Sequence, residues 1–197
     1  MTTTQFQRLG ILALLVLTMA VTRLHHFAAI PDASWAVFFL GGFYLRGWVR
    51  WAFPLLIAVA VAVDYLVISG QGLNFWTHYC VSPAYWFLAP AYFVLWLGGT
   101  WLARAHAQLS PAAVGAAAAS VLIAVSACYL ISNGSFYWLS PSVAAPSLAG
   151  WIKNLGDWYL PYLGTTALYL AAAAVLHLLA SLLVRALAAG NDRALPH

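Results

Sequence analysis

The stretch FFLGGFYLRGWVRWAFPLLIAVAVAVDYL, residues 38–66, decides the fold class of this chain. Two apolar runs flank the basic segment RGWVR, and the second run ends near a single acidic residue, Asp64. Apolar runs separated by a short arginine-containing turn are typical of consecutive membrane helices that meet on the cytoplasmic side. The segment therefore predicts two such helices joined at residues 46–50.

The overall composition leads to the same class. Of the 197 residues, 64% are hydrophobic and only 6% are charged, whereas a soluble domain needs several times that charge to cover its surface. We expect an all-α integral membrane protein with the lipid bilayer as a partner. The net charge of +4 comes mostly from arginines beside apolar runs, so no nucleic-acid partner is expected. Glutamate is absent, which argues against a proton relay or metal cage built from several carboxylates.

Six apolar segments are the predicted membrane helices, and together they form a single membrane domain over residues 1–197. They span residues 7–23, 34–45, 51–68, 84–104, 111–132 and 158–187. The second segment has about 12 residues and is too short to cross a hydrocarbon core of ~30 Å by itself. We interpret the first segment as a retained helix and not a signal peptide, because no small-residue cleavage site follows it.

The basic residues predict the orientation of the bundle. With the N-terminus inside, the cytoplasmic side holds Arg8, Arg46, Arg50, Arg104, Arg185 and Arg193, and only Arg23 and Lys153 fall outside. The positive-inside rule therefore places both termini in the cytoplasm. The outward connections are then residues 24–33, 69–83 and 133–157, which are long and rich in aromatic and polar side chains.

Cys80 lies in the second outward connection, within NFWTHYCVSP, residues 74–83. The residue pattern leaves three interpretations open: an inert small thiol, a disulfide with Cys128, or a metal ligand. His78 and Cys80 are too few for zinc, which takes three or four protein ligands, and His25 and His26 are the other outward histidines. A single thiolate better suits an axial position on a metal already held in a macrocycle.

Other residues of the predicted spans also have two interpretations. Asp64 is either functional, because an ionisable group inside a span is costly, or a structural aspartate bonded to backbone or to a tyrosine. The outward aromatic residues either anchor the headgroup region or line a ligand cavity. We interpret His177 as a packed neutral histidine bonded to a neighbouring helix.

The residues quoted first carry a family resemblance. Gly41, Gly42, Tyr44, Arg46 and Asp64 resemble the second and third helices of the substrate-binding S-components of ECF vitamin transporters. With NFWTHYCVSPAYW, residues 74–86, the chain resembles the small bacterial cobalamin transporters of that fold, the BtuM family. The resemblance implies a six-helix S-component fold in the bacterial inner membrane and uptake of cobalamin from the periplasmic face.

The resemblance also implies a role for Cys80 as axial ligand of cobalt. Cobalamin is then the transported ligand, and no intrinsic cofactor is expected. A thiolate that replaces cyanide on cobalt would promote decyanation of cyanocobalamin. The expected binding residues are Asp64, Asn74, Phe75, Trp76, His78, Tyr79, Cys80, Tyr85, Asn133, Phe136, Tyr137 and Trp138.

One departure from the family concerns the partner. S-components dock on a shared membrane subunit through an Ala-x-x-x-Ala pattern in the first helix, and LGILALLVLTMAVTRL, residues 9–24, lacks it. We therefore expect no obligatory ECF module. The alternative function is a membrane-embedded thiol or haem-linked oxidoreductase, which needs a second redox group or a general acid or base, and the chain offers few.

Overall fold

The computed structural model describes residues 4–24, 30–105 and 111–194. Within these residues the chain forms helices and no strands, which confirms the predicted all-α class. The α-helices are α1 (Gln5–Leu24), α2 (Ser34–Leu45), α3 (Val49–Gly70), α4 (Leu88–Ala105), α5 (Pro111–Leu139) and α6 (Leu148–Ala194). Three short 3-10 helices join them: η1 (Arg46–Trp48), η2 (Phe75–Thr77) and η3 (Pro83–Phe87).

Five helical stretches of the described chain are long and apolar enough to cross a membrane, as a membrane protein requires. They are Gln5–Leu24, Ser34–Gly70, Pro83–Ala105, Pro111–Leu139 and Leu148–Leu187. The stretch Ser34–Gly70 contains α2, η1 and α3, which follow one another without a loop. With 12 residues, α2 remains too short to cross alone.

The short helix α2 lies in the core of the bundle. Nine of its 12 residues are buried, and its largest interface is with α4. Glycines on both helices bring the two backbones into contact: a Cβ added at Gly42 would collide with the backbone oxygen of Trp96, and one at Gly99 with that of Phe39. The Thr100 hydroxyl also donates a hydrogen bond of 3.1 Å to the carbonyl of Gly42. This helix is therefore shielded by its neighbours.

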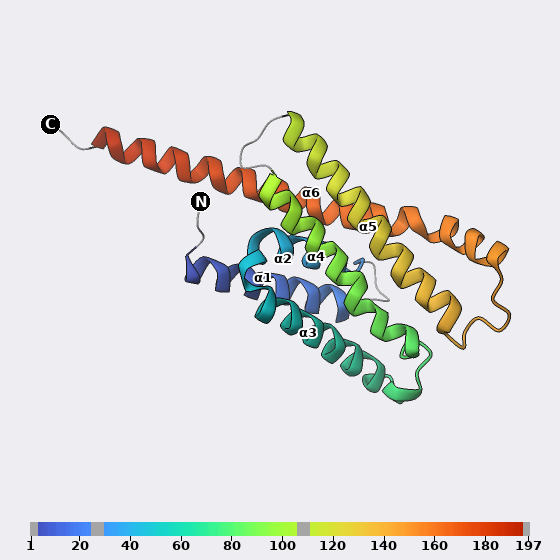
Figure 1. Cartoon of the computed structure of the whole chain (residues 1–197). Coiled ribbons are helices and arrows are strands. Elements are labelled where there is room, and N and C mark those ends of the chain that lie inside the picture. The colour runs from blue at the N-terminus through green and yellow to red at the C-terminus, as the bar shows by residue number, and fades with distance from the viewer. Residues whose placement is uncertain (1–3, 25–29, 106–110, 195–197) are drawn as a thin grey trace.

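The helices are arranged so that the N- and C-terminal ends of the chain lie toward one end of the bundle (Figure 1). The second end contains the C-terminal parts of α1, α3 and α5 and the first turns of α4 and α6, and we call it the Arg23 end. Beyond the opposite end, α6 continues past the other helices (Figure 1).

Two helix boundaries near the Arg23 end differ from the sequence prediction. Helix α5 continues to Leu139 and α6 already begins at Leu148, so the predicted connection 133–157 shrinks to residues 140–147. Polar residues extend both helices because they bond across the interface, as in the 2.6 Å bond from Asn133 Nδ2 to Asn154 Oδ1. Pro141 and Pro146, which cannot continue a helix interior, fall within the actual connection.

Candidate functional site

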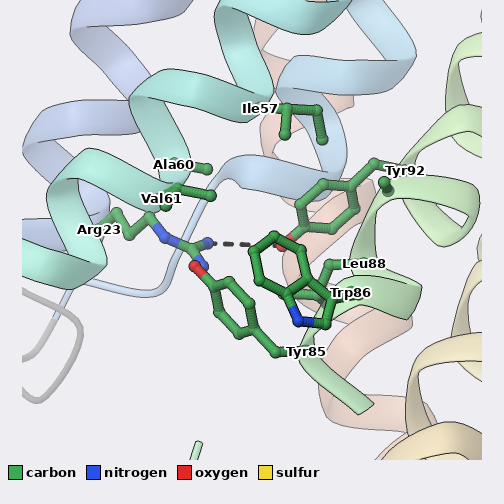
Figure 2. Close-up of a pocket in the computed structure, with 9 residues that line it drawn as sticks. Arg23, Ile57, Ala60, Val61, Tyr85, Trp86, Leu88 and Tyr92 are labelled. Carbon is green, nitrogen blue, oxygen red and sulfur yellow. Dashed lines mark hydrogen bonds between the residues drawn. The ribbon is translucent and has the colours of Figure 1, made fainter. Parts of the chain in front are cut away.

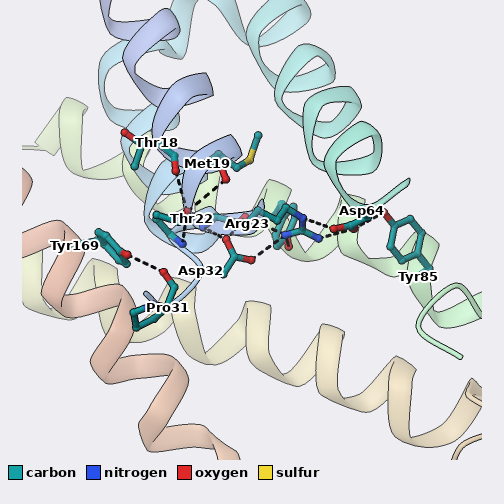
Figure 3. A network of polar contacts seen from close by, with 12 residues as sticks. Thr18, Met19, Thr22, Arg23, Pro31, Asp32, Asp64, Tyr85 and Tyr169 are labelled. Atoms are coloured by element: carbon teal, nitrogen blue, oxygen red, sulfur yellow. Dashed lines mark hydrogen bonds and ion pairs between the residues drawn. The ribbon is translucent and has the colours of Figure 1, made fainter. Parts of the chain in front are cut away.

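Arg23 is the centre of a polar cluster at the Arg23 end (Figure 3). Its Nε donates to Asp64 Oδ1 at 2.6 Å and its Nη2 to Asp64 Oδ2 at 2.7 Å, the two-pronged geometry of a strong guanidinium–carboxylate pair. Its Nη1 donates to Asp32 Oδ2 at 2.9 Å, to Ser34 Oγ at 3.0 Å and to the Tyr92 hydroxyl at 3.4 Å. One side chain therefore connects α1, α2, α3 and α4.

The chain around residue 33 is folded to present Asp32 to this cluster. Asp32 Oδ1 accepts the backbone N–H of Ser34 at 2.9 Å and its hydroxyl at 2.6 Å, an Asx turn that starts α2. The Thr22 hydroxyl accepts the backbone N–H of Ala33 at 3.1 Å and donates to the Thr18 carbonyl at 2.8 Å. These bonds hold the end of α1 against the start of α2.

Asp64 also accepts a hydrogen bond of 2.6 Å from the Tyr85 hydroxyl. The interpretation of Asp64 as an aspartate bonded to a tyrosine is thus confirmed, but its ionic partner Arg23 was missed. One cation and two carboxylates give the cluster a net charge of −1, and Arg23 is only 8% exposed. Because Arg23 is buried and the two carboxylates are partly buried, loss of either kind of charge leaves the other without its partner, which is costly. One feature of the sequence could have indicated this role: Arg23 is one of only two basic residues that the predicted orientation places outside the cytoplasm.

A small pocket adjoins the cluster between α3 and α4. Arg23, Tyr85 and Tyr92 turn their polar ends toward one another there, and the other walls are mostly aliphatic (Figure 2). The lining residues are Arg23, Ile57, Ala60, Val61, Tyr85, Trp86, Leu88, Ala89 and Tyr92. Its volume of about 40 Å³ admits a few water molecules, whereas pockets for drug-sized ligands measure about 300 Å³ or more.

The loop between α3 and η3, residues 71–82, carries Cys80 and is called the Cys80 loop. Asn74 Oδ1 accepts the backbone N–H of Trp76 at 2.9 Å and so caps η2. His78 Nδ1 accepts the backbone N–H of Cys80 at 3.3 Å. Trp76 and Tyr79 are 69% and 53% exposed, while Phe75 is buried against Tyr85. Hydrogen bonds between its own residues therefore hold the loop in shape, and its exposed face is aromatic.

The Cys80 thiol is half-buried and not in a disulfide. Burial raises its pKa above the ordinary value, and the negative charge of Asp64 adds to this. The Tyr79 hydroxyl and the positive charge of Arg23 act in the opposite direction. Interaction with Cys80 in turn raises the pKa of Tyr79. Cys80 is thus mainly a neutral thiol at pH 7, chiefly because burial disfavours its charged form.

Cys128 is fully buried among the apolar core residues of α5. Like Cys80, it is a free thiol, so the disulfide considered between these two residues is not present. The interpretation as an inert small hydrophobe describes Cys128. Cys80 differs from it by its exposure and polar neighbours.

The predicted site residues of α5 lie in a different environment. Asn133 uses its amide groups within the bundle, since Trp151 Nε1 donates to its oxygen at 3.2 Å and its nitrogen donates to Asn154. The Tyr137 hydroxyl accepts the backbone N–H of Ser147 at 3.3 Å, and Trp138 contacts the ring of Trp151. These contacts lead to α6 and its preceding connection, whereas those of Asp64 and Tyr85 meet at the Arg23 cluster. Phe136 is 37% exposed.

Two histidine predictions have different outcomes. The Tyr44 hydroxyl lies 3.0 Å from His177 Nδ1, which confirms the predicted bond from His177 to a neighbouring helix. The side chain is exposed, however, so the prediction that it is packed is wrong. His25 and His26 lie outside the described residues. Among the residues that the structure does describe, no three His, Cys, Asp or Glu side chains come together as a metal site.

Comparison with known protein families and with curated proteins finds no match for this chain. The resemblance to S-components therefore stays a prediction. Any function has to be proposed from the chemistry of the site.

Proposed function

We propose that this protein binds cobalamin and takes it up across the bacterial inner membrane, with Cys80 as an axial ligand of cobalt. The observation that carries the proposal is the setting of Cys80: a free, half-buried thiol in an ordered loop, next to exposed aromatic rings and a buried charge cluster. An inert thiol would more commonly be buried among apolar residues, as Cys128 is.

The chemistry of cobalamin matches this setting. Its cobalt(III) has four ring nitrogens and two axial positions, so one soft thiolate supplies a strong and directional contact. The corrin face is apolar and its rim carries amides. The exposed rings of Trp76 and Tyr79 offer apolar surface, and the side chain of Asn74 and the second ring nitrogen of His78 offer polar partners.

Cobalamin is far larger than the 40 Å³ pocket beside Arg23. We infer that the corrin ring lies against the outer face of the Cys80 loop, where the aromatic rings are exposed. The pocket between α3 and α4 is then not part of the proposed cobalamin site. Passage of the ligand through the bundle requires the helices to separate from the arrangement described above.

With cyanocobalamin, the proposed binding step is a ligand exchange. A cobalt–sulfur bond forms and the cobalt–carbon bond to cyanide breaks, with its electron pair leaving on cyanide. The Cys80 proton is transferred to cyanide, so the thiol and cyanocobalamin yield the thiolate complex and hydrogen cyanide. Cobalt remains trivalent, and no oxidant or reductant takes part.

Absorbance spectra of the purified full chain test this proposal. Adding cyanocobalamin or aquocobalamin is expected to shift the corrin bands and, with cyanocobalamin, to release cyanide. Cys80→Ala is expected to abolish the shift, and Cys128→Ala, the matched control, to keep it. A wild-type spectrum in the Cys80 variant would refute the cobalt ligand. A Soret band in the purified protein would favour the haem-linked oxidoreductase instead.

The proposal includes an S-component arrangement of six membrane helices, of which α2 does not cross the bilayer by itself, with both termini in the cytoplasm. It also includes transport without an obligatory ECF module. Proteoliposomes that contain only this chain are expected to accumulate labelled cobalamin, and reporter fusions to either terminus should locate both ends in the cytoplasm. Accumulation that requires a second protein would contradict the independence from a partner, but not the binding site.

A further inference from the structure

Arg23 is the least replaceable member of the charge cluster. Its guanidinium is buried, it pairs with both oxygens of Asp64, and it also reaches Asp32 on the neighbouring element. Because an unpaired charge in this position is costly, the arginine fixes the rotamer and location of Asp64. The carboxylate of Asp64 is thereby presented to the Tyr85 hydroxyl.

Tyr85 connects Asp64 to the Cys80 loop. Its hydroxyl donates to Asp64 Oδ2 at 2.6 Å, on the oxygen that also accepts Arg23 Nη2. Its backbone N–H donates to the Ser82 carbonyl at 2.9 Å, and the N–H of Val81 donates to the His78 carbonyl at 2.8 Å. The chain from 78 to 85 therefore consists of two consecutive turns, so a fixed Tyr85 also fixes Cys80.

One buried polar group destabilises the observed position of the Cys80 loop. The Ser82 side chain is buried, and its hydroxyl has no hydrogen-bond partner in the described structure. A buried, unsatisfied hydroxyl favours movement of the loop toward water. Some other contact must oppose this tendency, and the Tyr85–Asp64 hydrogen bond, strengthened by the charge of Asp64, is placed to do so.

We propose that Arg23 is a positioning residue for Cys80, which acts through Asp64 and the Tyr85 hydroxyl to hold the Cys80 loop in the orientation that presents the thiol to cobalt. This inference rests on the proposed function for its purpose. The positioning itself is a separate physical claim about one loop. Arg23 is assigned no contact with the ligand.

The test measures the position of the loop through the reactivity of Cys80. The full chain carries Cys128→Ala, so that Cys80 is its one thiol, and the probe is a water-soluble maleimide. Tyr85→Phe removes the hydroxyl and keeps the ring. Tyr92→Phe is the matched control, because its hydroxyl also contacts Arg23, at 3.4 Å, but belongs to α4 and not to the turns that hold Cys80.

We expect Tyr85→Phe to raise the maleimide rate about tenfold, the equivalent of losing one hydrogen bond to a charged group. Tyr92→Phe should change it less than about twofold, because its contact with Arg23 is long, at 3.4 Å, and does not reach the turns that hold Cys80. Arg23→Lys, which keeps the charge but loses the two-pronged geometry, should fall between them. The rates are taken across a pH series, since an altered loop position raises the plateau at high pH, whereas an altered pKa only displaces the curve.

Aquocobalamin titrations of the same variants separate this inference from the proposed function. Weaker binding by Tyr85→Phe than by Tyr92→Phe, together with the faster labelling, supports both. Faster labelling in a protein that binds no corrinoid supports the positioning and overturns the cobalamin proposal. Equal labelling rates and plateaus in the parent, Tyr85→Phe and Tyr92→Phe would overturn the inference, whatever the protein binds.

Discussion

The crossing of α2 and α4 and the Arg23 cluster lie in the same bundle but hold their helices together by different contacts. At the crossing, Gly42 and Gly99 let two backbones touch, and no titratable side chain separates them. At the Arg23 end, one guanidinium and two carboxylates connect four helices through side chains. The crossing excludes water, whereas the donors and acceptors of the cluster can exchange partners.

This difference indicates where the protein is able to respond to a ligand. The backbone contact at the crossing offers no alternative arrangement, because there is no side chain to move. The Arg23 cluster has charged groups next to the half-buried Cys80 loop. We therefore expect the crossing to keep its geometry during binding and the Arg23 end to change.

The largest effect on stability is expected from Arg23→Met, which leaves the carboxylates of Asp32 and Asp64 without their cation. The free energy of unfolding should fall by about 3–5 kcal/mol, as for other broken buried pairs. Unfolding followed in detergent would measure this. The double variant Arg23→Met/Asp64→Asn should recover part of the loss, because it also removes one unpaired charge. Equal stability of the single variant and wild type would mean that the cluster is not a stabilising contact.

The crossing should be nearly as sensitive to a single methyl group. Gly42→Ala places a Cβ against the Trp96 backbone, and we expect a loss of about 2–3 kcal/mol because the two helices must separate. Gly156→Ala in α6 is the control, since nothing lies within 4 Å of its added Cβ. That variant should be neutral, or stabilised by up to about 1 kcal/mol through helix propensity. Equal effects of the two substitutions would show that the close crossing is unimportant.

A pH dependence is expected at the charged end and not at the crossing. Since the pKa of Cys80 is raised, its thiolate fraction, and with it the maleimide rate, should still be increasing at a pH where an unfolded cysteine has nearly saturated. Rates measured from pH 7 to 10 on the folded chain and on a peptide of residues 74–86 would show the displacement. Coincident curves would contradict the burial of the Cys80 thiol in the folded chain.

The smallest effect concerns a contact outside both regions. Tyr44→Phe removes the 3.0 Å bond to His177, which links α2 to α6. Polar bonds between membrane helices average about 0.6 kcal/mol, so a loss of that size is expected in the free energy of unfolding. A loss as large as that of Arg23→Met would show that α6 depends on this one contact.

Several features of the fold were predictable because they are local. Apolar runs interrupted by arginines indicated the membrane helices, and the bounds of α2, residues 34–45, were predicted without error. The extension of α5 and α6 was not predictable, because polar and aromatic residues such as Asn133 and Trp151 are typical of a loop. Only the structure shows that they bond to each other across the interface of the two helices. Asp64 and Tyr85 both belong to the expected binding residues, and the structure shows a bond between them. Asn133 and Tyr137 of the same set instead contact α6 and its preceding connection.

By itself, the sequence determined that this protein is helical and apolar, and that Cys80 lies in a polar, aromatic connection between two long helices. Composition and local pattern are enough for these properties. The tertiary structure alone decided that Arg23 meets Asp64, 41 residues away, and that Tyr85 joins their pair to the Cys80 loop. An unpaired buried charge is costly, so buried charges of opposite sign pair with one another. Which of them come within hydrogen-bond distance depends on how the helices pack.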